Sequence, residues 1–199
     1  MNGFEKRKER KKHNIITASF ELFSKYGVQK VSIQQIAKAA DVSQVTIYNY
    51  FGGKDQLLLE TIKSFAYDLL ESSRAILHSS ALDFKGKLDH MIHSEKESFF
   101  HMDADFIQSI MSEHPEIKAF ISSFTNEESI PLFIELIEQG KDEGYISDEL
   151  SYQSIMIYID MYAQALRKHK ELYRTEEDIK RFTDEFTHLF FYGLLGDPS

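Results

Sequence analysis

The sequence contains no cysteine, only three prolines and no long apolar run. Without cysteine the chain has no disulfide, no thiolate metal ligand and no thiol nucleophile. No apolar segment approaches the ~18 residues that a membrane-spanning helix needs, and the charged N-terminus does not resemble a secretory signal. With 42% hydrophobic and 28% charged residues, the composition is typical of a folded globular protein. We therefore expect a cytoplasmic protein with no membrane partner.

Positive and negative charges are distributed unequally along the chain. Residues 1–54 contain ten lysines and arginines against four acidic residues, whereas residues 55–199 contain thirteen against twenty-eight. A basic segment on an acidic body predicts a module that binds a polyanion, joined to a part that does not. A charged tail that only improves solubility is the alternative explanation.

Apolar residues recur with helical periodicity, and strand-like alternation is weak throughout. The pattern predicts an all-α protein of nine or ten helices. The first helix is expected over residues 6–26, with Ile16, Phe20 and Phe23 on its buried face and Gly27 ending it. Later helices are expected near residues 54–79, 83–101, 103–111, 151–170 and 175–196, with Pro115 and Pro131 in first turns and Gly144 as a terminator.

Two short helices separated by a tight turn, ahead of a long helix, predict a helix-turn-helix. Ser32 begins a capping box at the first short helix. Asp41 occupies the turn, and Ser43 caps the second short helix, over residues 44–51. Gly52-Gly53 then breaks the chain before the long helix begins.

The second short helix has two different faces. Ile47 and Phe51, four residues apart, are expected to point inward. The other face carries amides that pair with adenine edges and a valine that meets thymine methyl groups, while nearby hydroxyls and a lysine suit phosphates. A basic run at residues 6–12 adds attraction that weakens with salt. The predicted DNA-binding residues are Ser32, Ser43, Gln44, Val45, Thr46, Tyr48, Asn49, Tyr50 and Lys54.

Three motifs follow one another in this part of the chain. They are Phe20-x-x-Phe23-x-x-x-Gly27, Ser32-x-x-x-Ile36-Ala37-x-x-Ala40-x-Val42-Ser43 and Thr46-Ile47-Tyr48-x-Tyr50-Phe51-Gly52-Gly53-Lys54-Asp55-x-Leu57. In order and spacing the series resembles the tetracycline-repressor (TetR) family of bacterial transcription regulators. The resemblance implies a DNA-binding domain over residues 1–53, a ligand-binding and dimerising domain over residues 54–199, no cofactor, and usually repression. Asp41 and Val45 depart from the commonest family pattern.

Two late helices each carry an apolar face, and the resemblance implies that these faces form the interface of a homodimer. A glycine within the second face permits close helix approach, and a reader of palindromic DNA needs a dimer. Packing within one subunit is the alternative. The predicted interface residues are Ile155, Ile159, Tyr162, Leu166, Phe182, Phe186, Leu189, Phe190 and Gly193.

A pocket for a small effector is expected among the middle helices, where methionine and phenylalanine side chains suit an adaptable apolar cavity. Each of these residue types is more often found in a plain core than in a pocket, so packing in the core is the alternative. The sequence does not identify the effector, nor whether it releases or promotes DNA binding. The candidate lining residues are Phe65, Leu69, Met91, Phe99, Met102, Phe106, Met111, Phe120, Phe124, Phe133 and Tyr158.

One polar cluster has helical spacing. His90, His93, Glu97 and His101 fall within about 80° of one another around a helix. We interpret them as a solvated polar face, with no metal bound. A metal site, a pH response and a contact to a polar ligand are the alternatives, although the ends are too far apart for one ion to bind all four.

Other function classes leave features of the sequence unexplained. No H-E-x-x-H, G-x-S-x-G, Walker loop or dinucleotide fingerprint occurs, so we do not expect an enzyme. A helical adaptor that binds only proteins would not explain the basic segment or the outward Gln44, Tyr48 and Asn49. The prediction is a regulator that binds an operator in double-stranded DNA as a homodimer, most simply a repressor that a small effector releases.

Overall fold

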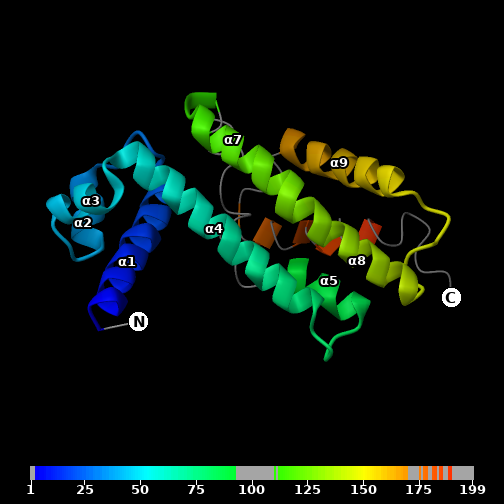
Figure 1. Cartoon of the computed structure of the whole chain (residues 1–199). Coiled ribbons are helices and arrows are strands. Elements are labelled where there is room, and N and C mark those ends of the chain that lie inside the picture. The colour runs from blue at the N-terminus through cyan, green and yellow to red at the C-terminus, as the bar shows by residue number, and fades with distance from the viewer. Residues whose placement is uncertain are drawn as a thin grey trace. The chain divides into compact units, whose positions relative to one another are not determined.

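The chain is all-helical, as the sequence predicts, in a computed structural model that describes residues 3–92, 110, 112–169 and, within the last segment, 175, 177, 178, 181, 182, 184, 185, 188 and 189 (Figure 1). Its elements are α1 (Gly3–Tyr26), α2 (Ile33–Ala39), α3 (Gln44–Phe51), α4 (Lys54–Leu77), α5 (Phe84–Ile92), α7 (Pro115–Phe124), the π-helical turn η2 (Thr125–Ser129), α8 (Ile130–Asp142) and α9 (Tyr152–Lys168).

The helices form two compact units, Met1–Ser147 and Asp148–Ser199. The domain boundary predicted after residue 53 falls inside the first unit. A division of function between DNA binding and ligand binding at that residue stays a prediction. None of the described helices is both long and apolar enough to cross a membrane.

Helices α2, α3 and α9 start where the sequence predicts, because the expected capping side chains make their hydrogen bonds. The Ser32 hydroxyl accepts from the Gln35 backbone N–H at 3.2 Å, and the Gln35 side chain accepts from the Ser32 N–H at 2.8 Å. Ser43 accepts from the Thr46 N–H at 3.1 Å, and Ser151 caps α9 in the same way. Each bond satisfies a backbone donor that has no partner within its helix.

Residues with a left-handed backbone follow α1 and α8, at the two glycines that the sequence predicts as helix terminators. Gly27 and Gly144, with φ of 81° and 78°, follow α1 and α8. Asp41, between α2 and α3, is a non-glycine residue with positive φ, at 53°. An aspartate tolerates this conformation better than most side chains, so the turn of the helix-turn-helix survives without glycine.

Helix α1 differs from the prediction in its start and in its buried face. It begins at Gly3, three residues before the predicted start. Ile15 and Phe23 are buried, whereas Ile16 and Phe20 are half-buried. The predicted stripe was therefore partly wrong, because α1 packs against both α2 and α4, and the directions of those neighbours select the buried side chains.

The segments α7, η2 and α8 form one unbroken helical run, which the sequence analysis did not predict (Figure 1). Pro131 lies in the first turn of α8, as expected, but the chain does not leave the helical conformation before it. Instead the Ile130 N–H donates to the Thr125 carbonyl, five residues back. A proline lacks the N–H of an ordinary helical bond, and a π turn ahead of it lets the helix continue.

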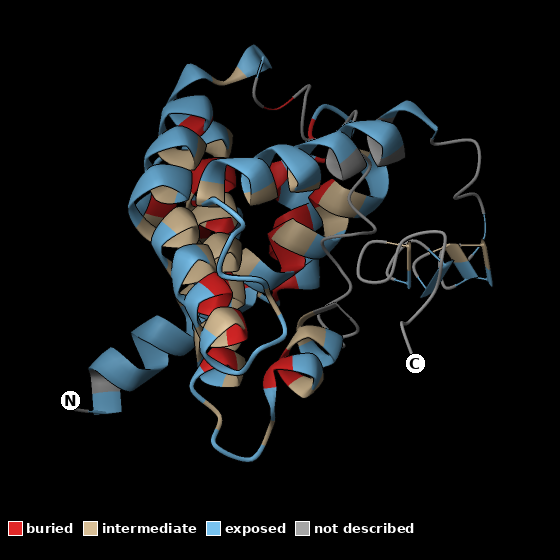
Figure 2. Ribbon diagram, turned by 90° about the vertical axis from the view of Figure 1, so that its right-hand side faces the viewer, coloured by how far each residue is buried: buried red, intermediate tan, exposed pale blue. Residues whose placement is uncertain are grey.

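Buried side chains gather in two apolar clusters along α4, and Figure 2 shows buried positions on several of the helices that surround it. The N-terminal cluster joins α1, α2, α3 and the start of α4, and it reaches Ile117 of α7. The distal cluster is formed by Leu77, Phe84 and Leu136, with partly buried neighbours from α5 and α8. The helix-turn-helix and the adjoining body therefore share one apolar core, the N-terminal cluster. Helix α4 runs from this cluster to the distal cluster.

Asp83 begins α5, as predicted, and it links this helix to the end of α8. Its carboxylate accepts from the Gly86 N–H at 2.8 Å and from the Tyr145 hydroxyl at 3.1 Å. The Gly86 bond and then the Tyr145 bond lower the pKa of Asp83, and the bond to Asp83 raises the pKa of Tyr145.

Candidate DNA-binding face and ligand cavity

Helix α3 has the two faces that the sequence predicts. Ile47 and Phe51 are buried in the N-terminal cluster. On the opposite side, Val45 is 65% exposed and Tyr48 is 51% exposed. A valine and a tyrosine held in solvent have no packing role in the subunit, so they are available to a partner. The exposed residues of this face are Gln44, Val45, Tyr48 and Asn49.

The predicted phosphate contacts surround this face. Ser32 and Ser43 are exposed, and both also cap helices. The Thr46 hydroxyl lies 2.9 Å from that of Ser43. Tyr50 is half-buried, with its ring edge-on to Phe51 at 6.4 Å, and Lys54 is half-buried at the start of α4. Every predicted DNA-binding residue is thus at least partly accessible, while contact with DNA stays a prediction.

The basic run lies in the first turns of α1. Lys6, Arg7, Lys8, Arg10 and Lys11 are exposed, and Lys12 is half-buried. In Figure 2 this end of α1 is exposed and projects beyond the helices of the body. The cationic side chains therefore surround the helix end rather than packing against the protein.

A cavity of about 470 Å³ lies beside α4, bounded by α5, α7, η2 and α8. Its described lining joins residues of the N-terminal cluster, such as Phe120, to residues of the distal cluster, such as Leu136. The cavity therefore occupies the space between the two clusters. Six of the predicted lining residues do line it, namely Phe65, Leu69, Met91, Phe120, Phe124 and Phe133.

The other predicted lining residues have different outcomes. Phe99, Met102, Phe106 and Met111 lie outside the described residues, and Tyr158 lies on α9 in the second compact unit. The sequence analysis missed three hydroxyl residues of the lining: Ser73, Thr125 and Ser129. Only their positions relative to the apolar lining distinguish them from surface residues, and that required the tertiary structure.

A groove of about 600 Å³ lies between α1 and α4 and shares Phe65 and Leu69 with the cavity. Phe20 of α1 lines this groove and stacks on Phe65. Phe65 therefore stands between the cavity and the helix that supports the helix-turn-helix.

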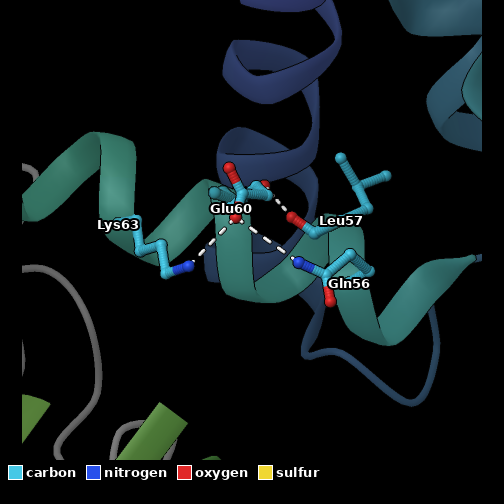
Figure 3. Close-up of polar contacts among 5 residues, drawn as sticks. Gln56, Leu57, Glu60 and Lys63 are labelled. Carbon is cyan, nitrogen blue, oxygen red and sulfur yellow. Dashed lines mark hydrogen bonds and ion pairs between the residues drawn. The ribbon is translucent and has the colours of Figure 1, made fainter. Parts of the chain in front are cut away.

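Figure 3 shows polar contacts between residues of α4. The Glu60 carboxylate accepts from the Lys63 ammonium at 3.1 Å and from the Gln56 amide at 3.4 Å. The Lys63 ammonium also lies 6.0 Å from the centre of the Phe120 ring of α7. This contact connects α4 to α7 beside the cavity, and a lysine over a ring face is favourable.

The predicted polar face contributes only His90 to the described residues, and His90 is exposed. His93, Glu97 and His101 lie outside them. Within the described part of the chain, no three or more histidine, aspartate or glutamate side chains group closely enough to hold a metal ion.

The predicted dimer residues are half-buried where the structure describes them: Ile155, Ile159, Phe182 and Leu189. Two other α9 residues are more open, with Ile157 61% exposed and Met161 62% exposed. The sequence analysis missed this second apolar face because it assigned only one apolar stripe to the helix. The side chains of Tyr162 and Leu166, and all of Phe186, Phe190 and Gly193, lie outside the described residues.

The short helix α3 with its exposed polar and aromatic face, joined to a helical body with an apolar cavity, defines a helix-turn-helix protein. A family model described as "Bacterial regulatory proteins, tetR family" matches residues 15–61, the segment that holds α2 and α3. In this N-terminal segment the chain is therefore similar to the TetR family of bacterial regulatory proteins. The description of that family as regulatory proteins agrees with the prediction of a regulator.

Similar proteins include the regulator HbdR of Aromatoleum sp. (strain CIB), which is 46% identical over 56 residues, or 28% of this chain and 24% of HbdR. The repressor KstR2 of Rhodococcus jostii (strain RHA1) is 25% identical over 149 residues, 71% of each chain. Relatives more than 30% identical are matched over a quarter to two fifths of their own length. The solved structure of the regulator FadR from Bacillus subtilis, in complex with stearoyl-CoA, superposes with a TM-score of 0.63 at 19% identity, over 92% of this chain and 98% of that chain.

Proposed function

We propose that this chain is a transcriptional repressor that binds a palindromic operator as a homodimer, in the cytoplasm, and leaves it when an effector fills the cavity. The observation that carries the proposal is the outward face of α3, where Val45 and Tyr48 are exposed beside the amides of Gln44 and Asn49. Such a face offers hydrogen bonds and apolar contacts to base edges in a major groove.

The charge distribution supports the same function. The cationic side chains of α1 occur in the same basic segment, residues 1–54, as the recognition helix, while the body is acidic. DNA phosphates attract the first and repel the second, so the molecule approaches DNA with the helix-turn-helix forward. Repression is supported by the similarity to KstR2, which is itself a repressor.

An effector role for the cavity is supported by the course of α4. This helix begins directly after α3, at Lys54, and lines the cavity with Phe65 and Leu69. A ligand that favours one position of α4 therefore also favours one position of the recognition helix, and it shifts the population toward dimers that do not fit the operator. The B. subtilis FadR structure, solved with stearoyl-CoA, supports a ligand-binding role for a body of this fold.

Dimerisation is supported by α9. Ile157 and Met161 are four residues apart, so they lie on one face of the helix, and both are mostly exposed. We add them to the predicted interface residues, because an apolar face left in water favours association.

The proposal is tested at Tyr48. An operator is first selected from a library of random duplexes, and binding is then measured by gel shift at fixed salt. Tyr48→Ala is expected to abolish the preference for the selected operator and to leave weak binding to unrelated DNA. Tyr26→Ala removes an equally open tyrosine, 49% exposed, from the end of α1 and serves as the matched control. Unchanged operator affinity of Tyr48→Ala would refute the assignment of α3 as the reading helix.

A further inference from the structure

Three hydroxyl groups interrupt the otherwise apolar lining of the cavity. Ser73 belongs to α4, and Thr125 and Ser129 are the first and last residues of η2. Ser73 and Ser129 are half-buried, and Thr125 is exposed, so the hydroxyls mark the rim. Residues 125 and 129 are four positions apart in a helical run, so they face the same side, and both line the cavity.

These hydroxyls differ from other helical hydroxyls of the chain. Those of Ser19 and Thr61 each donate to the carbonyl four residues back, at 2.7 Å. Among the described residues, the side chains of Ser73, Thr125 and Ser129 make no such hydrogen bond. A polar group beside an apolar cavity is favourable only when it finds a partner, and a ligand in the cavity supplies one.

The cation next to Ser73 is already paired with carboxylates. The Arg74 guanidinium, next to Ser73, contacts the Glu71 carboxylate at 2.8 Å and the Glu128 carboxylate at 3.3 Å. One cation is thus shared between two carboxylates, and exposed Glu127 adds a third. No charged side chain of the described residues lines the cavity itself. A negatively charged head group would lose hydration here and meet like charges.

The cavity volume limits the size of the ligand. At roughly 30 Å³ per non-hydrogen atom, the share that a water molecule occupies in the liquid, a space of 470 Å³ holds about fifteen such atoms. The aromatic rings of Phe65, Phe120, Phe124 and Phe133 surround this space.

We infer that the effector is an uncharged amphiphile, with an apolar body of about ten to fifteen non-hydrogen atoms and a hydroxyl, carbonyl or ester group bound by Ser73, Thr125 and Ser129. The inference rests on the proposed function, because it takes this cavity as the effector site. The apolar body fills the gap between the two core clusters, and the polar group meets the hydroxyls at the rim.

The test compares probes that share one apolar chain and differ in the head group: 1-decanol, decanoate, decyltrimethylammonium and decanoyl-CoA. Binding to the full-length protein is followed by calorimetric titration and by the shift in melting temperature. We expect 1-decanol to bind at one molecule per chain, at least ~10-fold more tightly than any charged probe. Tighter binding of decanoate or decanoyl-CoA, tighter binding of the ammonium, or no binding of 1-decanol would each overturn the inference.

Variants locate the polar group. Ser73→Ala and Ser129→Ala are each expected to weaken 1-decanol binding by several-fold to ~10-fold, the effect of removing one hydrogen bond. Ser72→Ala, at the neighbouring position of α4 and outside the cavity lining, is the matched control and is expected to bind as the wild type does. Equal affinities in all three variants would place the head group elsewhere and overturn the assignment.

Operator binding without any probe separates this inference from the proposed function. A protein that binds its operator but not 1-decanol retains the regulatory function and loses the proposed ligand class. A protein that binds 1-decanol but no operator loses the regulatory function, while the ligand class stands.

Discussion

The rings of Phe20 and Phe65 stack in parallel, with their centres 4.4 Å apart and their planes inclined by 7°. Phe20 belongs to α1, which packs against α2 of the helix-turn-helix, and Phe65 belongs to α4, where it also lines the cavity. The stack is therefore a direct contact between the helix that packs against the helix-turn-helix and the proposed effector site. A ligand that displaces Phe65 must also move or break its contact with α1.

Replacing Phe20 with leucine tests this coupling. Phe20→Leu keeps an apolar side chain but removes the stacked pair, which contributes about 0.5–1.5 kcal/mol. We expect operator affinity without effector to be almost unchanged, and its decrease at saturating effector to be about two- to tenfold smaller than in the wild type. Gel shifts with and without effector measure both quantities.

Phe133→Leu is the control for that experiment, because Phe133 lines the cavity from α8 and is not among the residues lining the α1–α4 groove. Phe133→Leu is expected to change the effector concentration that releases DNA. The decrease in operator affinity at saturating effector should equal that of the wild type. If saturating effector lowers the operator affinity of Phe20→Leu as much as that of the wild type, the signal passes from α4 by another contact.

The basic start of α1 is expected to act on all DNA alike. The double variant Lys6→Gln/Lys8→Gln should lower affinity for operator and unrelated duplexes by the same factor. It should also reduce the slope of log affinity against log salt by about 0.9 for each phosphate that the variant no longer neutralises. Lys85→Gln/Lys118→Gln removes two exposed lysines of the body and should change neither. A loss confined to the operator would mean that α1 reads sequence.

A charge on the exposed face of α9 is expected to separate the dimer. Met161→Glu places a carboxylate in an apolar contact where it has no partner, which is costly when the face becomes buried. Analytical ultracentrifugation should give a monomer whose helix content by circular dichroism equals that of the wild type. A dimer of unchanged stability would assign association to another surface of the chain.

The close approach of α8 to Phe84 requires glycine. A Cβ atom at Gly140 would lie 2.7 Å from the Phe84 ring and 2.8 Å from Ile146. Gly140→Ala is expected to lower the free energy of unfolding by about 1–3 kcal/mol, as overpacked cores do, as measured in urea. A Cβ at Gly3 meets nothing within 4 Å, so Gly3→Ala should stay within about 0.5 kcal/mol of the wild type.

The contact between Asp83 and Tyr145 is expected to respond to acid. Because the pKa of Asp83 is lowered in the folded protein, its stabilising effect is complete above the unfolded pKa of about 3.9 and is lost as pH falls through the folded value. Denaturation midpoints of wild type and Asp83→Asn should therefore differ at pH 7 and converge toward pH 2. A constant difference over this range would contradict the assignment.

The local features of the helix-turn-helix could be predicted from the sequence. Ser32 and Ser43 cap their helices, and Asp41 turns the chain between them, because these bonds join residues only a few positions apart. The division of α3 into a buried face with Ile47 and an open face with Tyr48 follows equally from helical periodicity.

The sequence by itself determined the fold class, the helix-turn-helix with its open face on α3, and six of the side chains around the cavity. Only the tertiary structure decided that those side chains enclose a space instead of filling it, because a phenylalanine of the core and one of a cavity wall have the same sequence pattern. It likewise decided the stacking of Phe20 on Phe65 and the grouping of Ser73 with Ser129. These contacts join residues 45 and 56 positions apart, and their geometry depends on how whole helices pack and on the π turn before Pro131, which local propensity does not specify.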